Sequence, residues 1–240
     1  MALTFDQWLI WRLRMHGAYA GSMDGVHGRA VIDALKKFQY AEKIPQSGKA
    51  DTATVTALQK QPGLSGQTVE APKTPVEPVW MREARRYMGL KEIAGAKSNP
   101  TIMGWAKKAG GWIANYFTDD DIPWCGLAVQ NWISTTLPEE LLPSNPLGAL
   151  NWKTFGREVP ACVGAILVFE RPGGGHVGFY VGEDRTHFHV LGGNQQNSVS
   201  ITRVEKDRLR ATRWPKTGEA PVPGRVQLQK SGAPISRNEA

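Results

Sequence analysis

Residues 161–193, ACVGAILVFERPGGGHVGFYVGEDRTHFHVLGG, decide the fold of the larger part of the chain. Two apolar runs rich in β-branched and aromatic residues flank the turn RPGGG, and EDRT then leads into HFHVLGG. Short apolar runs separated by turn residues are typical of antiparallel strands. A further strand, SVSITRVE, is expected over 198–205. We therefore predict an antiparallel meander in this half of the chain.

Helical patterns precede these strands. Apolar residues recur at helical spacing over 80–92, and a second helix is expected over 99–108. From Cys125 onward, an apolar run ending near Trp132 predicts a buried helix of about ten residues. Helices followed by antiparallel strands are the α+β pattern, so we expect an α+β domain.

The composition limits the partners. The chain has 240 residues, is 41% apolar and carries a formal net charge of +7. Such a charge favours a polyanion, whether nucleic acid, a membrane surface or an anionic wall polymer, and does not choose among them. No apolar run reaches the ~18 residues of a membrane span. The N-terminus has Asp6 early and no basic segment before its apolar patch, so no secretory signal is expected.

Two segments dense in Pro, Gly, Ser and Thr divide the chain and are typical of linkers and tails. The expected organisation is a helical domain over 1–60, a linker over 61–79, an α+β domain over 80–215 and a flexible basic tail over 216–240.

The first domain contains a half-repeat. DGVHGRAVIDAL at 24–35 aligns in register with SGKADTATVTAL at 47–58. Gly25 and Gly48 supply turn conformations that other residues resist, and Asp51 is placed to cap the helix after the second turn. With an earlier helix over 6–15, the pattern predicts a three-helix module.

The segment GAYAGSMDGVHGRAVIDALKKFQYAEKIPQSGKADTATVTAL resembles the peptidoglycan-binding domain type 1. The matching positions are Gly17, Tyr19, Gly21, Asp24, Gly25, Gly28, Ala34, Phe38 and Gln39. Arg29-Ala30-Val31 departs from the usual Pro-x-Thr at the helix start. The resemblance implies binding to cell-wall glycopeptide, with Tyr19 and Asp24 expected at the ligand.

Cys125 is the first candidate for chemistry. It follows Pro123-Trp124 and begins an apolar helical run. A helix N-terminus and a nearby histidine both lower the pKa of a thiol, and backbone N–H groups there can hold an oxyanion. The alternative is a small buried hydrophobe. The chain's other cysteine, Cys162, is expected in the core, and two cysteines without Cys-x-x-Cys spacing predict neither a disulfide framework nor a zinc site.

A base for such a thiol comes from a distant part of the chain. Of five histidines, His176 opens a strand directly after three glycines that end at Gly175, where the missing side chains let a cleft approach. A hairpin turning near Asp184 brings Asn194 beside the start of that strand. An Asn carbonyl there accepts the imidazole N–H and orients the ring.

The order Cys125, His176, Asn194, with PWCGLAVQNW, VGAILVFERPGGGHVGFYVGE and VLGGNQQNSVSI around it, resembles the CHAP branch of papain-like cysteine hydrolases, most of all those of phage endolysins. The resemblance implies a papain-like α+β fold, those three residues as catalytic groups, and no cofactor. Gly164-Ala165 stands where many relatives have Gly-Asp, and Gly192 where many have an acid. The orienting role therefore falls on Asn194, helped by Gln195.

Three consecutive acids, Asp119 to Asp121, precede the cysteine. Consecutive side chains point in different directions and the loop lacks EF-hand spacing, so a solvated acidic loop without metal is expected. The alternative is that Asp121, four residues before Cys125, hydrogen-bonds near the cysteine or binds a substrate ammonium. Trp124 and Gly175 are expected to line the cleft, with packing an equal alternative for Trp124. His187 and His189 share one strand face, but no third metal ligand is evident.

Together these features predict a modular peptidoglycan hydrolase of the endolysin type, with endopeptidase activity favoured over N-acetylmuramoyl-L-alanine amidase activity. The alternatives are an inactive wall-binding protein and a secreted antibacterial effector. The expected partner is peptidoglycan. No nucleic acid is expected, because no basic stripe or aromatic RNA-binding motif is present. No stable membrane insertion is expected either. A monomer is expected, held in a host cytoplasm before lysis and acting on the wall after release.

Overall fold

The chain forms two compact units, Met1–Val76 and Glu77–Ala240. The computed structural model describes residues 3–64, 66–73, 75–95 and 97–228. Within those ranges, no helix combines the length and apolar character that crossing a membrane requires. The boundary between the units falls inside the segment expected to be a linker, 61–79.

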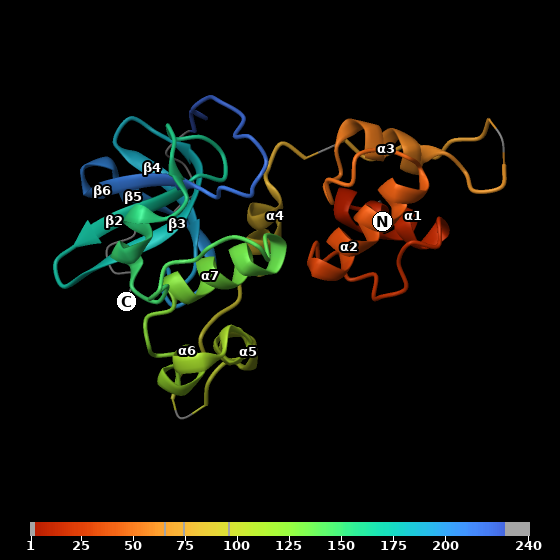
Figure 1. The fold of residues 1–240 in the computed structure, drawn as a ribbon. Helices are drawn as coiled ribbons and strands as arrows, with labels where there is room; N and C mark the ends of the chain where they lie inside the picture. The colour runs from red at the N-terminus through yellow and green to blue at the C-terminus, as the bar shows by residue number, and fades with distance from the viewer. Residues whose placement is uncertain (1–2, 65, 74, 96, 229–240) are drawn as a thin grey trace. The chain divides into compact units, whose positions relative to one another are not determined.

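The first unit contains three helices, as the half-repeat predicts: α1 (Phe5–Met15), α2 (Arg29–Ala41) and α3 (Thr52–Gln59) (Figure 1). Thr4 starts α1 with a capping box, and Asp51 accepts a hydrogen bond from the Thr54 backbone N–H at the start of α3. The apolar faces of the helices form one core of Phe5, Trp8, Leu9, Ile10, Leu13, Val31, Ala34, Leu35, Phe38, Ala57 and Leu58.

Gln39 joins the two halves of the repeat. Its side-chain oxygen accepts the Gly48 N–H at 2.8 Å, and its side-chain nitrogen donates to the Thr54 hydroxyl at 2.8 Å and to the Lys49 carbonyl at 2.9 Å. Gln39 is fully buried, so these bonds satisfy an amide that water does not reach. The Phe-Gln end of the motif therefore stabilises the fold. Phe38 packs in the core, and Gln39 hydrogen-bonds to the turn at Gly48.

The chain after α3 turns back on that helix. Val69 donates its backbone N–H to the Gln59 carbonyl at 2.7 Å, and Lys60 forms a β-bridge with Thr68. The first part of the segment expected to be a linker is therefore tied to the first unit.

The second unit places helices before strands, as expected for an α+β domain. Its helices are α4 (Val79–Arg85), α5 (Pro100–Ala109), α6 (Gly111–Tyr116) and α7 (Cys125–Thr136), with the 3-10 turns η1 (Ala149–Thr154) and η2 (Lys206–Arg208). The strands are β1 (Arg157–Glu158), β2 (Ile166–Arg171), β3 (Gly174–Glu183), β4 (His187–Gly192), β5 (Ser200–Glu205) and β6 (Leu209–Trp214).

These strands form an antiparallel sheet in the order β1-β6-β2-β3-β4-β5, with α7 packed on β3 and β4 (Figure 1). The meander predicted from residues 161–205 is β2 to β5. Strand β6 was not predicted, because LRATRW offers neither an apolar run nor β-branched residues at alternate positions. It pairs with β2 and lies inside the sheet.

The helix predicted over 80–92 is wrong in its second half, because α4 ends at Arg85. Gly89 adopts a left-handed φ of 84° and donates its N–H to the Val199 carbonyl at 2.9 Å. Val199 in turn donates to the Leu90 carbonyl at 2.8 Å. Pairing with the segment before β5 thus replaces the last helical turns.

Part of the segment predicted to be a flexible tail, 216–228, forms hydrogen bonds with the second unit. Glu140, 8% exposed, accepts backbone N–H groups from Lys216 at 2.9 Å and Thr217 at 2.7 Å. Farther on, Glu183 exchanges backbone hydrogen bonds of 2.8 Å with Val226 and Leu228. The basic end of the tail, 229–240, lies outside the described residues.

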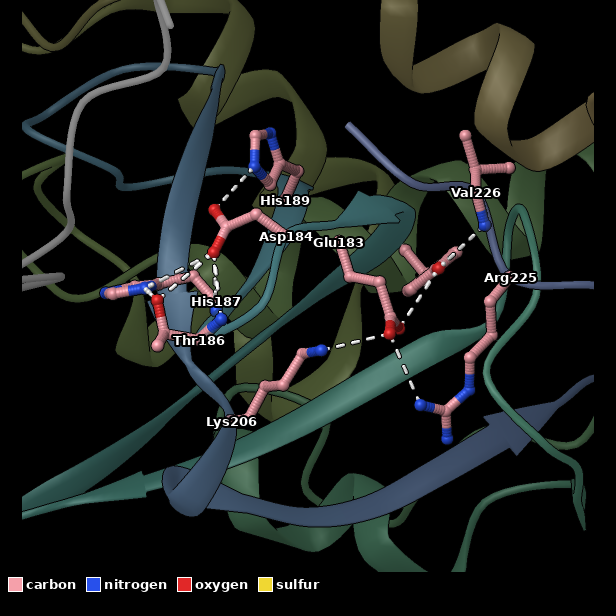
Figure 2. Close-up of polar contacts among 9 residues, drawn as sticks. Glu183, Asp184, Thr186, His187, His189, Lys206, Arg225 and Val226 are labelled. Carbon is pink, nitrogen blue, oxygen red and sulfur yellow. Dashed lines mark hydrogen bonds and ion pairs between the residues drawn. The ribbon is translucent and has the colours of Figure 1, made fainter. Parts of the chain in front are cut away.

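A buried carboxylate at the end of β3 reinforces this attachment (Figure 2). Glu183 accepts from Lys206 Nζ at 2.9 Å and from Arg225 at 3.2 Å. Burial alone would raise the pKa of Glu183, but the hydrogen bond and charge of Lys206, with the charge of Arg225, lower it. The Tyr180 hydroxyl donates to Glu183 and accepts the Val226 N–H, and burial raises the pKa of Tyr180 to about 12.

The next residue, Asp184, closes the β3–β4 turn. Its carboxylate is 4% exposed and accepts from Arg203 Nε at 2.7 Å and His189 Nε2 at 3.1 Å. It also accepts the backbone N–H groups of Thr186 at 2.9 Å and His187 at 3.1 Å (Figure 2). These bonds, the one from Arg203 first, hold the pKa of Asp184 far below its usual range. The two strand histidines therefore belong to a structural cluster.

Asp184→Asn is expected to reduce the free energy of unfolding at pH 7 by about 3 kcal/mol, because it leaves a buried arginine without its counter-charge. A depressed native pKa gives stability that is complete above the unfolded value of about 4 and is lost as pH falls through the native value. Urea unfolding of both proteins should therefore converge as pH falls from 5 toward 2. The exposed Asp207→Asn control should stay within ~0.5 kcal/mol of wild type; an Asp184→Asn deficit independent of pH would contradict this account.

Candidate functional site

Cys125 is the first residue of α7 and is 3% exposed, so the predicted helix start at the cysteine is confirmed. Gly126, the next residue, lets another segment of the chain approach the first turn of α7. A Cβ at Gly126 would lie 2.2 Å from the Pro146 carbonyl oxygen and 2.6 Å from that of Leu147. Only glycine permits this approach, and the segment before η1 therefore closes over the first turn of the helix.

His176 is fully buried in β3, and its Nε2 lies 3.0 Å from Gln195 Oε1. The Gln195 amide nitrogen is committed elsewhere: it donates to the carbonyls of Ser200 at 2.6 Å and of Val190 and Gly192 at 3.3 Å. The oxygen therefore faces the ring, and His176 Nε2 must carry a hydrogen to donate to it. In the neutral ring the basic lone pair is then on Nδ1.

Two adjacent glycines connect His176 with the head of α7. A Cβ at Gly192 would lie 3.1 Å from His176 Nε2. A Cβ at Gly193 would lie 2.7 Å from the Ala128 Cβ and 2.5 Å from the Trp124 ring. Consecutive residues thus contact the histidine and the first turn of the helix that Cys125 begins. The structure brings the elements carrying these two candidates to one short segment, 192–195.

The structure replaces Asn194 with Gln195 as the partner of the imidazole. Asn194 is 1% exposed, and its Oδ1 has no hydrogen-bond partner among the described residues. Asn194, Gln196 and Asn197 have left-handed φ values of 56°, 53° and 58°. This tight turn directs Gln195 to the ring, one residue later than the sequence suggested. Strain of this kind in non-glycine residues often marks functional sites.

The same bond explains the glycine at 192. The resemblance expects an acid there, yet a Cβ at Gly192 would also lie 3.2 Å from Gln195 Oε1. Gln195 Oε1 occupies the space beside Nε2 and supplies an acceptor there, so a side chain at 192 would have to displace it. The missing acid is therefore not the loss of an acceptor, and the sequence signal for this lay in the Gln195 that follows Asn194.

Trp124 is buried and donates its indole N–H to Glu92, a residue that the sequence analysis missed. Trp124 therefore packs and does not present its ring to solvent. Burial raises the pKa of Glu92, and the carboxylates of Asp120, Asp121 and Asp119 raise it further. Glu92 comes from the segment that pairs with 197–199, so a contact across 32 positions gave no local signal.

The three acids are not simply a solvated loop. Asp120 is fully buried and accepts the backbone N–H groups of Asn99 at 2.7 Å and Ile93 at 3.1 Å. Asp119 accepts the N–H of Asp121, which is exposed. One oxygen from each acid lies within 4.8 Å of the others, contrary to the divergence expected, and oxygens so placed suit a hard cation. The turn that buries Asp120 draws the three together.

Gly175 is placed differently from the expectation of an open cleft. A Cβ there would lie 2.7 Å from the Phe169 carbonyl oxygen and 2.9 Å from the Leu150 side chain. Gly175 therefore allows close packing of β3 against β2 and η1. Of the three glycines before His176, Gly173 alone has no atom within 4 Å of where a Cβ would lie.

In the first unit, Tyr19 and Asp24 bind their own loop. The Tyr19 hydroxyl donates to the Ser22 carbonyl at 3.1 Å. Asp24 accepts from the Ser22 hydroxyl and the Val26 N–H, each at 2.9 Å. Both residues shape the turn before α2, and Asp24 is exposed.

Residues 7–58 match the family model described as "Putative peptidoglycan binding domain". The match covers α1 to α3 and includes both halves of the repeat. It supports binding to peptidoglycan and association with the cell wall. No curated protein and no solved structure matches the chain significantly.

Proposed function

We propose that the protein is a peptidoglycan hydrolase that cleaves an amide bond of the wall peptide with Cys125 as nucleophile. The main support is that segment 192–195 contacts His176 on one side and the first turn of α7 on the other. The wall-binding family match supplies the substrate class. The CHAP-like order of cysteine and histidine supports the chemistry.

In the proposed reaction, the Cys125 thiol gives its proton to His176 Nδ1 and the sulfur attacks the carbonyl carbon. Gln195 Oε1 holds Nε2–H, which fixes the tautomer with its lone pair on Nδ1 and stabilises the imidazolium. Backbone N–H groups at the head of α7 stabilise the oxyanion. The imidazolium then protonates the leaving amine, and a thioester remains. Water gives a proton to His176, attacks the thioester and frees the carboxylate and the thiol.

Burial of the site favours a second candidate function. Cys125 is 3% and His176 0% exposed, so both side chains of the proposed pair are largely covered. A non-catalytic wall-binding protein would show the same burial. We favour the enzyme because a packing role alone does not require the single-tautomer hydrogen bonding of Gln195.

The setting we propose is bacteriolysis by a phage endolysin that acts on the wall after release from the host cytoplasm; a secreted antibacterial effector would use the same chemistry. The test is to incubate the protein with purified sacculi and identify products by mass spectrometry. Fragments with new amino termini inside the peptide would indicate an endopeptidase, which we favour, and free stem peptides an amidase. If the protein sediments with sacculi but releases no soluble product at any pH from 5 to 9, the hydrolase proposal is refuted.

A further inference from the structure

One face of α6 presents aromatic side chains to solvent. Trp112 is 46% and Tyr116 60% exposed, and Asn115 between them is exposed as well. Ile113 and Phe117 point the other way and are buried in the core. Residues three and four apart share a helix face, so the three outward side chains form one surface, here named the α6 face.

The two rings of the α6 face do not cover each other. Their centroids are 6.1 Å apart and their planes are inclined by 58°. Both side chains therefore remain open to solvent. Large aromatic side chains exposed side by side are uncommon on a protein surface and mark binding sites, where Trp and Tyr often dominate the affinity.

The α6 face is carried by α5, which packs on the helix that Cys125 begins. α5 packs against α7, and the chain reverses at Gly110 and Gly111, with φ values of 70° and 53°, so that α6 packs back on α5 (Figure 1). Trp105 of α5 packs on Trp124, the residue before Cys125, with ring centroids 6.0 Å apart. A ligand on this hairpin is therefore bound by the same packed body that begins the helix of the nucleophile.

The charge of the hairpin indicates the kind of ligand. Residues 100–118 contain Lys107 and Lys108 but no acid, and the three aspartates at 119–121 follow directly after them. Lys107 is exposed, and the α6 face itself is uncharged. A polymer with an uncharged backbone of rings complements the uncharged α6 face. Sugar rings offer C–H groups to the negative face of an aromatic ring, and the Asn115 amide matches a hydroxyl or acetamido group.

We propose that the α6 face binds the glycan strand of the cell wall, with an N-acetylated amino sugar against Trp112 and Tyr116 and its amide or hydroxyl on Asn115. The choice of wall glycan rests on the proposed function. The face holds the strand while an attached peptide is presented to the catalytic unit.

The test is an NMR titration of the full chain with an N-acetylglucosamine tetramer and with peptide-free glycan strands. Among nine tryptophans, the Trp112 indole N–H is assigned from Trp112→Phe. We expect it to shift on titration, and Tyr116→Ala to raise Kd at least about tenfold, as for an anchoring aromatic. Tyr116→Phe should stay within ~3-fold, since a ring remains to stack. Leu141→Ala, which removes an 86% exposed apolar side chain from the same unit, should leave Kd unchanged.

The outcomes separate this inference from the proposed hydrolase, since the titration involves no bond cleavage. A shifted Trp112 indole in a protein that does not cut sacculi would support the glycan site and refute the enzyme. An unshifted indole with both ligands would overturn the glycan site, even in an active enzyme. Equal weakening by Leu141→Ala, or a dimer that Tyr116→Ala dissociates in sedimentation experiments, would overturn it too.

Discussion

Cys125→Ala is expected to lower the rate of release of soluble fragments from sacculi by at least about 10⁴-fold, the scale on which removal of a nucleophile from a hydrolase acts. The loss should appear in the rate and not in binding, because the wall-binding family match lies wholly in the first unit and Cys125 is not part of the α6 face. Wild type and Cys125→Ala should therefore sediment equally with sacculi. The measurement is the initial rate of soluble product release, quantified by mass spectrometry.

Cys162→Ala is the matched control, since both cysteines are buried and free of disulfides. Burial raises the pKa of the Cys162 thiol, which keeps it protonated, as suits a core residue. Its replacement should cost stability but leave the rate within ~3-fold of wild type, since the side chain takes no part in the chemistry. Equal loss of rate in both variants would show that Cys125 contributes packing and not chemistry.

The sequence predicts the larger elements of the fold because their signals are local. The repeat before α2 and α3 and the apolar runs of β2 to β5 each lie within one window of residues. β6 and the shortened α4 depend on pairing with distant segments, so periodicity does not show them. The attachment of residues 216–228 depends on Glu140 and Glu183, which are far away in sequence and individually ordinary.

The candidate site divides in the same way. Cys125 and His176 are recognisable from a helix start and a glycine-framed strand. The partner of the imidazole is displaced by one residue because three left-handed residues set the direction of each side chain in the turn, a property that composition does not specify. Glu92 and the inward turn of Asp120 arise from contacts between segments more than 20 positions apart, so no local pattern announces them.

Gln195→Met is expected to lower the rate of wall cleavage by about 10³-fold, because it removes the acceptor that fixes the imidazole tautomer. Methionine has a side-chain volume similar to that of glutamine. Asn194→Gly is the matched variant. It removes the neighbouring amide and tolerates the φ of 56° at that position, so its rate should stay within ~5-fold of wild type. The pair tests which of the two adjacent amides orients His176.

Because Gln195 also donates to three backbone carbonyls, its loss is expected to destabilise the turn by a few kcal/mol, and the rate alone does not separate the two effects. ¹⁵N NMR of the His176 ring does. Wild type and Asn194→Gly should show the proton on Nε2 in the neutral ring, whereas Gln195→Met should show a mixture of tautomers in a protein that remains folded by circular dichroism. An unchanged tautomer in Gln195→Met, or a rate collapse in Asn194→Gly alone, would return the orienting role to Asn194.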